Sequence, residues 1–346
     1  MPRPRTTTIL DVARDAGVSR QTVTRALNDM PGIAPATRDR VVAAARALGY
    51  RPNRAAQSLV KGAGTTVGLL VESLRNPYYS ELASELSRAA AARGWGLILC
   101  DVGYGSDRDA RLSPLLRRVD ALVGCLPAGA TADVDVPFVA IDNPDETVGD
   151  ATVWIDHEVG VRAALQHLVA TGRRHVAMID SGPEPSTRCL AYRAFLAEAG
   201  LAWSERSEVR VEESHDGGIA AAVELLDRDL AMDAVLAFND VLAVGAMKGM
   251  AQAGRRVPDD VAVVGMDGLD LGGLVTPELT TAATDRGVIA TAALELVDAL
   301  LVGGEERPGG PAESAGRSEA PGPPETSAAA RPRRTIVPHL VVRASA

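Results

Sequence analysis

The chain has 346 residues, of which 46% are apolar and 23% are charged, so it is long enough for two or three domains of ordinary size. No run of about 18 uncharged apolar residues is present, and no apolar segment follows the basic N-terminus, so neither a membrane span nor a secretory signal is predicted. The net charge of −9 is unevenly distributed, because residues 1–61 carry +7 and the remainder carries −16. We expect a cytoplasmic protein whose basic N-terminal segment contacts a polyanion, although a solvated basic arm would give the same charge.

Cysteine usage argues against cross-linking and metal binding. Cys100, Cys125 and Cys189 are an odd number of cysteines without C-x-x-C spacing. Such a set encodes neither a disulfide framework nor a zinc site. We therefore expect buried thiols, and we expect no metal and no cofactor.

Residues 1–52 are predicted to form a three-helix, helix-turn-helix head. Thr8 and Asp11 have the spacing of a capping box for the first helix, and Ser19 is a suitable N-cap for the second. The tight turn between these two helices is typical of helix-turn-helix. The second and third helices are expected over residues 20–27 and 37–48.

Residues 53–64 are predicted to be a hinge helix and linker. The segment 53–60 favours helix but spans only about two turns, and helices shorter than about 12 residues are marginal in water. Gly62 and Gly64 then break the pattern. We expect this helix to form only in a complex.

From residue 65 onward, short apolar strands alternate with helices. Strands are expected over 67–71, 97–100, 121–123, 138–141, 175–179, 234–237 and 261–264, and a helix near 80–93. This pattern predicts an α/β fold with parallel sheets covered by helices on both faces. The length favours two lobes with a cleft, and ligands of such sheets bind beyond the carboxyl ends of strands, here the loops after residues 71, 141, 179, 237 and 266.

The segment 303–334 is predicted to be a disordered insertion. It contains no Val, Ile, Leu, Met, Phe, Trp or Tyr and therefore cannot bury a core. A strand-like segment over 335–342 follows it. The body is accordingly expected to comprise residues 65–302 and 335–346.

Several motifs, in this order, resemble the lactose/galactose repressor (LacI/GalR-type) family of transcription regulators. They are Thr8-Ile9-Leu10-Asp11-Val12-Ala13, Ala16-Gly17-Val18-Ser19 and Gly49-Tyr50-Arg51-Pro52-Asn53 in the head, and Asn76-Pro77-Tyr78-Tyr79, Phe238-Asn239-Asp240, Gly265-Met266-Asp267 and Thr276-Pro277-Glu278-Leu279 in the body. The similarity covers nearly the whole chain except 303–334. The resemblance implies a homodimer on palindromic double-stranded operator DNA, with a two-lobed, periplasmic-binding-protein-like body that gates the head.

The resemblance also implies which head residues contact DNA. Base contacts fall to Arg20, Gln21 and Arg25, since arginine pairs with guanine and glutamine with adenine. Phosphate contacts, which position the head without specifying sequence, fall to Thr8, Ser19, Thr22, Asn28, Thr37 and Tyr50. Thr8 and Ser19 have an alternative role as helix caps.

The segment over 53–60 matches the hinge helix that enters the minor groove of DNA in members of the family. Leu59 matches the apolar wedge that unstacks and bends the duplex, Ala56 lies close to the groove floor, and Asn53 belongs to the same DNA-contacting segment. The alternative role of Leu59 is packing on the body.

Effector contacts are implied by the resemblance for Tyr78, Tyr79, Arg188, Asn239 and Asp267. Aromatic rings with a guanidinium, an amide and a carboxylate suit a polyol, so we expect a sugar or sugar derivative. As an alternative, Asn239 and Asp267 cap helices and an Arg188–Asp267 ion pair clamps the lobes. Weaker candidates for the cleft are Trp154 and His157.

The chain departs from the family pattern near the expected cleft. Glu213 lies near the place where some members carry a stacking aromatic, and Arg286 lies where many have proline or an aromatic. If Arg286 reaches the cleft, its positive charge favours an anionic or phosphorylated effector. Both residues are also compatible with surface positions.

The sequence therefore predicts an effector-controlled transcription regulator, which we expect to be a repressor. One alternative to a transcription regulator is a solute sensor whose head acts only through another protein. An enzyme that uses Asp240, Asp267 and His157 as acid and base is the catalytic alternative, but no nucleophile, metal spacing or phosphate-binding loop supports it. Whether the effector induces or co-represses is left open.

Overall fold

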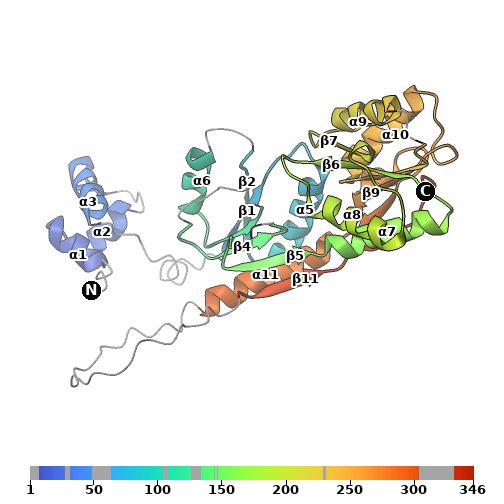
Figure 1. The fold of residues 1–346 in the computed structure, drawn as a ribbon. Helices are drawn as coiled ribbons and strands as arrows, with labels where there is room; N and C mark the ends of the chain where they lie inside the picture. The colour runs from blue at the N-terminus through green and yellow to red at the C-terminus, as the bar shows by residue number, and fades with distance from the viewer. Residues whose placement is uncertain are drawn as a thin grey trace, which may run out of the picture. The chain divides into compact units, whose positions relative to one another are not determined.

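Three short helices make up the described part of the N-terminal unit (Figure 1). The computed structural model describes residues 8–27, 32–48, 64–103, 108–125, 134–143, 145, 147–228, 231–303 and 331–346, and the chain divides into two compact units, 1–64 and 65–346. The helices are α1 (Ile9–Asp15), α2 (Arg20–Leu27) and α3 (Pro35–Ala47). α3 begins earlier than the predicted residue 37 because proline in the first turn has a helical φ and lacks only an N–H that would be unpaired there.

Local hydrogen bonds fix the starts of α1 and α2. The Asp11 carboxylate accepts hydrogen bonds from the Thr8 backbone N–H at 2.9 Å and from the Thr8 hydroxyl at 2.7 Å. The Ser19 hydroxyl accepts from the backbone N–H of Thr22 at 3.1 Å, so both residues take the capping role. The helices enclose a small core of Val12, Ala13, Ala16, Val23, Ala26, Val41, Ala44 and Ala45.

The first lobe of the body is built on a six-stranded parallel sheet with the order β11-β5-β4-β3-β1-β2. Its strands are β1 (Thr66–Val71), β2 (Gly96–Asp101), β3 (Ala121–Gly124), β4 (Phe138–Ile141), β5 (Ala151–Ile155) and β11 (Arg333–Ile336). Figure 1 shows β11, from the end of the chain, beside β5. The sheet therefore joins segments that are far apart in the sequence.

Helices cover both faces of this first sheet. α5 (Pro77–Ala92) and α11 (Arg286–Gly303) pack on the face that includes Leu69, and α6 (Arg108–Leu116) packs on the face that includes Leu70. Adjacent strand residues point to opposite faces, so β1 is apolar throughout because both of its faces are buried.

The second lobe repeats this plan with the strand order β12-β10-β9-β8-β6-β7. Its strands are β6 (Val176–Ser181), β7 (Glu208–Val211), β8 (Ala234–Ala237), β9 (Ala262–Asp267), β10 (Thr280–Ala283) and β12 (His339–Val341). One face packs on α7 (His157–Ala170) and α8 (Thr187–Ala199), and the other on α9 (His215–Asp227) and α10 (Asp240–Gln252). The short helices η1 (Glu205–Ser207) and η2 (Asp270–Gly273) lie in loops.

Two expectations about the body need correction. The predicted insertion over 303–334 is too long, because Gly303 ends α11 and Arg333 and Arg334 pair with β5 within β11. A ladder of backbone hydrogen bonds at a sheet edge requires no apolar side chains, and the Arg333 guanidinium stacks 4.7 Å from the Trp154 ring. The second sheet is also not wholly parallel, because β12 pairs with β10 in the antiparallel direction.

The chain passes between the two lobes three times. The connections are residues 155–157 after β5, 283–286 after β10 and 336–339 after β11. These crossings hold the carboxyl ends of both sheets near each other and place the strand-end loops around a common space. Among the described helices, none combines the length and apolarity needed to cross a membrane.

Candidate DNA-binding surface and effector cleft

The head presents a polar face at the start of α2. Arg20 and Gln21 are exposed there, and Thr8 and Ser19 are exposed at the helix starts. The remaining described candidates, Thr22, Arg25 and Thr37, are half-buried. Because Arg20 and Gln21 are exposed, while Val23 holds the same turn to the head's core, these two side chains are available to a groove of DNA.

Arg25 is less available than Arg20 and Gln21. Its guanidinium lies against the turn before α3, since a Cβ added to Gly32 would stand 3.0 Å from Arg25 Nη2. The other predicted DNA contacts lie outside the described residues, as does the predicted hinge helix over 53–60; these contacts are Asn28, Tyr50, Asn53, Ala56 and Leu59.

The body contains a cavity of about 530 Å³ between its lobes. The loops after β1, β4, β6 and β8 and the last residues of β9 contribute lining residues, as the strand-end rule predicts. The structure brings together all five predicted effector residues in the lining, namely Tyr78, Tyr79, Arg188, Asn239 and Asp267. Trp154 and His157 line the same cavity.

The two tyrosines form one wall of the cavity. Asn76 begins α5 by accepting a hydrogen bond from the Tyr78 backbone N–H at 3.0 Å, which fixes the first turn that carries both rings. The rings meet edge to face with centroids 5.4 Å apart. The Tyr79 hydroxyl donates to Glu72 at 3.2 Å, whereas the buried Tyr78 hydroxyl has no hydrogen-bond partner among the described residues. Burial raises the pKa of both tyrosines.

Arg188 is the cation of the cavity's inner part. Its guanidinium lies 4.1 Å from the centre of the Phe238 ring, and Nη2 is 3.9 Å from the Asp142 carboxylate. The Arg188–Asp267 clamp considered above is not formed, because Asp142 takes this pairing. The Arg188 Nε atom is buried without a hydrogen-bond partner among the described residues. A buried donor without a partner is costly, so this site favours a ligand that supplies an acceptor.

Asp142 and His157 are in contact in the cavity, which was not predicted from the sequence. Both carboxylate oxygens of Asp142, in the first lobe, lie 2.8–2.9 Å from His157 Nε2, at the start of α7 in the second lobe. Burial opposes ionisation of Asp142, but His157 and Arg188 outweigh it and lower its pKa. Burial and the charge of Arg188 lower the pKa of His157, so a neutral imidazole donates to an ionised carboxylate. The only sequence signal was the position of Asp142 directly after a predicted strand.

This contact predicts a pH-dependent stability. Unfolded histidine binds a proton below about pH 6.5, whereas buried His157 resists protonation, so its contribution to folding is present above that pH and is lost as the pH falls. Glutamine places an amide donor near Nε2 and does not titrate. On lowering the pH from about 7.5 to about 5.5, we expect the Tm of the parent to fall relative to that of His157→Gln in thermal unfolding scans. Two parallel Tm profiles would contradict the assignment.

Asn239 and Asp267 are held in different ways. The Asn239 side chain accepts from the Leu242 backbone N–H at 2.9 Å, so it caps α10, and its amide also donates to Glu213 at 2.9 Å. Asp267 has φ of 114°, and within the described ranges no hydrogen bond reaches its carboxylate. Asp142, with φ of 48°, is the other non-glycine residue with positive φ in these ranges. Strained backbone at two cleft residues is typical of a functional site.

Arg286 does not line the cavity. Its guanidinium donates to the backbone oxygens of Asp267 at 2.8 Å and Gly268 at 2.6 Å, and it pairs with Glu81 at 2.8 Å. The residue therefore fixes the loop that carries Asp267. Because Arg286 does not reach the cleft, it gives no support to an anionic effector. No group of His, Cys, Asp and Glu side chains in the described part of the chain is arranged to hold a metal ion.

The cleft continues outward into a second compartment of about 870 Å³. Seven residues line both compartments, namely Glu72, Asn76, Tyr79, Ser181, Gly182, Pro183 and Glu213. Glu213 Oε1 accepts a hydrogen bond from Asn76 Nδ2 at 2.6 Å, so the second lobe contacts the first at this boundary. Burial raises the pKa of Glu213.

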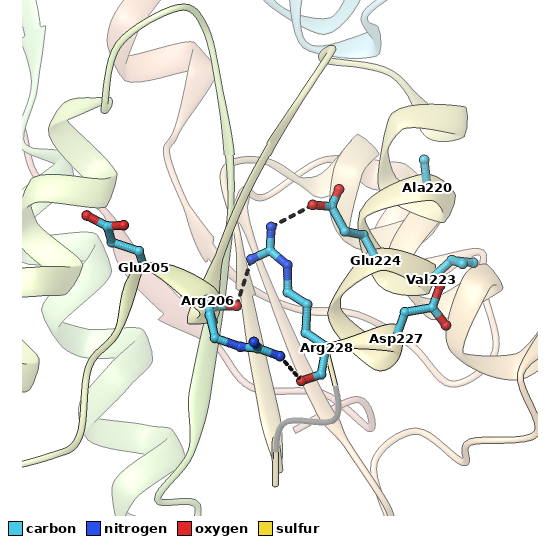
Figure 2. A pocket seen from close by; sticks show the side chains of 7 residues that line it. All are labelled: Glu205, Arg206, Ala220, Val223, Glu224, Asp227 and Arg228. Atoms are coloured by element: carbon cyan, nitrogen blue, oxygen red, sulfur yellow. Dashed lines mark hydrogen bonds and ion pairs between the residues drawn. The ribbon is translucent and has the colours of Figure 1, made fainter.

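Another hollow, between η1 and α9, is shown in Figure 2. Both arginine side chains of this hollow form hydrogen bonds within the protein. Arg206 donates to the Arg228 backbone oxygen at 2.6 Å. Arg228 donates to the Arg206 and Glu208 backbone oxygens, each at 2.7 Å. Glu224 accepts from Arg228 at 2.5 Å. These contacts join the loop before β7 to the end of α9. None of the described residues that line this hollow has a buried polar side-chain atom without a hydrogen-bond partner.

Comparisons with known proteins agree with both parts of this geometry. Residues 8–53 match the family described as bacterial regulatory proteins, lacI family, and residues 165–317 match a periplasmic binding protein-like domain. The chain is 35% identical over 306 residues to the HTH-type transcriptional regulator CelR of Thermobifida fusca, covering 81% of this chain and 88% of that protein. Relatives of this kind are transcription regulators rather than enzymes.

Two solved structures extend the comparison. A LacI family transcriptional regulator from Arthrobacter sp. FB24, in complex with lactose, is 32% identical, with a TM-score of 0.67, 81% of this chain and 99% of that chain covered. The lac repressor dimer bound to operator and the anti-inducer ONPF is 26% identical, with a TM-score of 0.67 and 99% of each chain covered. With its helix-turn-helix head and its two-lobed cleft, this chain belongs to the lacI family of bacterial regulatory proteins.

Proposed function

We propose that this protein is a cytoplasmic repressor that binds a palindromic operator as a homodimer and is controlled by a small polyol in the body's cleft. The observation that carries the proposal is the pair of buried, unpartnered polar atoms, Tyr78 Oη and Arg188 Nε, in a cavity between two lobes. Such atoms are stabilised by a ligand with hydroxyl groups, which donate and accept hydrogen bonds.

A homodimer is supported by an apolar surface on the second lobe. Leu274 is 85% exposed, and the neighbouring groove beside α10 is lined by apolar residues that include Val244, Met247, Val275 and Pro277, together with Lys248, Arg255 and Arg256. An exposed leucine beside a groove with apolar and charged lining residues is typical of an interaction surface. A second copy of the chain is its proposed occupant, as the related repressor structure is a dimer. A dimer also matches the twofold symmetry of a palindromic operator.

The proposed switch is a change in the contacts between the lobes. Asn76–Glu213 and Asp142–His157 both join the first lobe to the second at the cleft. An effector seated between them changes the balance of open and closed lobes only if it binds one state more tightly than the other. We propose that this change is transmitted to the segments over 53–60 of the dimer and decides whether they stay helical on DNA.

The proposal is tested by fluorescence anisotropy of the full chain on fragments of its own promoter region. The titrations include a salt series and a panel of sugars. We expect tight binding to one fragment, a steep loss of affinity with salt, and an affinity that at least one compound either lowers or raises. Equal weak binding to all fragments, unchanged by any compound, would contradict the proposal and favour a solute sensor that acts through another protein.

The same assay tests the role of α2 with two arginine variants. Arg20→Ala is expected to weaken binding to the preferred fragment by about 1–3 kcal/mol, the usual discrimination of a bidentate base contact. Arg46→Ala, at an exposed position in the last turn of α3, removes the same charge and serves as the control. We expect the control to keep the preference among fragments. Equal losses for the two variants on every fragment would reduce Arg20 to a non-specific phosphate contact.

A further inference from the structure

The cleft carries more acidic than basic groups. Its lining includes the carboxylates of Glu72, Asp142, Glu213 and Asp267, and the described cation of the inner compartment is Arg188. Arg188 lies next to Asp142, which also receives the hydrogen bond from His157. The charge of Asp142 is therefore balanced locally, and the inner compartment offers Glu213 and Asp267 no second described cation.

The outer compartment adds little positive charge to this balance. Arg210 lies 3.6 Å from the Asp180 carboxylate and donates to the Pro183 backbone oxygen at 3.2 Å, so it is already paired. Arg75 is exposed on the loop after β1. Both arginines line the outer compartment together with Glu213, but no ion pair joins either of them to Glu213 among the described residues.

Glu213 is held in place by neutral donors alone. The amides of Asn76 and Asn239 both donate to Oε1, at 2.6 and 2.9 Å. No ion pair of Glu213 occurs among the described residues. Arg188, which is also paired with Asp142, is the described cation that lowers the pKa of Glu213. A second cation, arriving with a ligand, stabilises this buried carboxylate further.

Asp267 is presented to the cavity by its backbone. Its carbonyl accepts from the Thr284 backbone N–H at 3.1 Å and from Arg286, which fixes the residue at its unusual φ. Its carboxylate has no hydrogen-bond donor in the described part of the chain. Burial raises the pKa of Asp267 well above its ordinary value, although Arg188 opposes the shift. The position therefore favours a ligand that brings positive charge.

Two further atoms indicate that a polar ligand is expected here. Tyr78 and Arg188 are each 9% exposed, and Tyr78 Oη and Arg188 Nε lack hydrogen-bond partners among the described residues. These two atoms suit hydroxyl groups, whereas the two carboxylates suit an ammonium group. The cavity thus offers separate contacts for two kinds of functional group.

We propose that the effector is a hydroxylated compound with a protonated amine, of the amino sugar class, whose ammonium group binds Glu213 and Asp267 while its hydroxyls bind Arg188 and Tyr78. This inference rests on the proposed function, because it takes the cleft to be the effector site. The hydroxyls of a neutral sugar also donate hydrogen bonds to carboxylates, but an ammonium group adds a full positive charge opposite the two buried carboxylates.

The test compares matched neutral and amino sugars on the full chain. Isothermal titration calorimetry at about pH 6.5, where such amines are protonated, uses glucose with glucosamine, galactose with galactosamine, and cellobiose with the chitosan disaccharide. We expect at least one amino sugar to bind about tenfold or more tightly than its neutral counterpart. Glu213→Gln, which keeps the side chain's shape and removes its charge, is expected to abolish this preference. Glu205→Gln, at an exposed position of the same lobe, is the charge-matched control and should keep it.

The outcomes separate this inference from the proposed function. The inference is overturned if no amino sugar binds more tightly than its neutral partner, or if the preference survives in Glu213→Gln. Release of the promoter fragment by a neutral sugar would then leave the proposed function standing. Conversely, a tightly bound amino sugar that leaves DNA affinity unchanged supports this ligand class and contradicts control of DNA binding by the cleft.

Discussion

Arg188→Met is expected to weaken binding of the effector at least about 100-fold while operator affinity stays within about twofold. Methionine keeps an apolar contact with the Phe238 ring but removes the charge beside Asp142 and the unpartnered Nε donor. The loss of one charged contact in a site shielded from water is worth about 2–5 kcal/mol. The measurement is the concentration of the effector that produces half of the maximal change in anisotropy on the preferred DNA fragment.

Arg162→Met is the matched control for this prediction. Arg162, on α7, also approaches an aromatic ring, at 5.9 Å from the centre of Phe195, and also pairs with a carboxylate, at 2.6 Å from Glu198. It does not line the cleft. If both variants shift the effector titration curve equally, or if neither does, Arg188 makes no direct contact with the effector.

Asp240→Ala is expected to lower the free energy of unfolding by about 3 kcal/mol. The Asp240 side chain is fully buried, and its carboxylate accepts from the Thr281 hydroxyl at 2.6 Å and from the Leu269 backbone N–H at 2.7 Å. Removing it leaves two buried donors without partners. Burial also raises the pKa of Asp240 to about 6, because desolvation outweighs these hydrogen bonds. Urea unfolding followed by circular dichroism gives the midpoint shift.

The control for this variant is Asp216→Ala in the first turn of α9. Asp216 is also an acidic residue at a helix start, but its side chain is 95% exposed. The substitution removes its interaction with the helix dipole and an exposed contact with His215 at 3.2 Å, and the dipole interaction is worth about 0.3–1 kcal/mol. A midpoint for Asp240→Ala equal to that of the control would mean that the two hydrogen bonds contribute nothing to stability.

Sequence patterns predicted the elements whose signals are local. The caps at Thr8 and Ser19 depend on residues three positions away, and β4 and β8 were placed correctly because their strands are apolar throughout. β7 and β10 were missed. β7 is an edge strand with alternating charged residues, and β10 consists of two threonines and two alanines, so neither shows the long apolar run expected of a buried strand.

The cleft was predictable in outline but not in its contacts. Parallel sheets place ligands at strand ends, and the five predicted loops do line the cavity. The partners of single side chains depend on how closely the two lobes approach each other. The periodicity of apolar residues in the sequence does not indicate this distance. Arg188 therefore pairs with Asp142 rather than Asp267, and Arg286 binds backbone oxygens outside the cavity. Glu213, noted only as a departure from the family pattern, lies at the contact between the lobes.

The placement of β11 and β12 has a consequence for synthesis of the protein. These two strands form the outer edges of both sheets, and both come from residues 333–341. Ser345, fully buried, also bonds to the Val263 backbone oxygen at 2.6 Å. A chain growing on the ribosome therefore has a helical head whose described core lies within residues 8–48, but two lobes that each still lack a strand. The order of translation makes the DNA-binding part available to fold first and the cleft last.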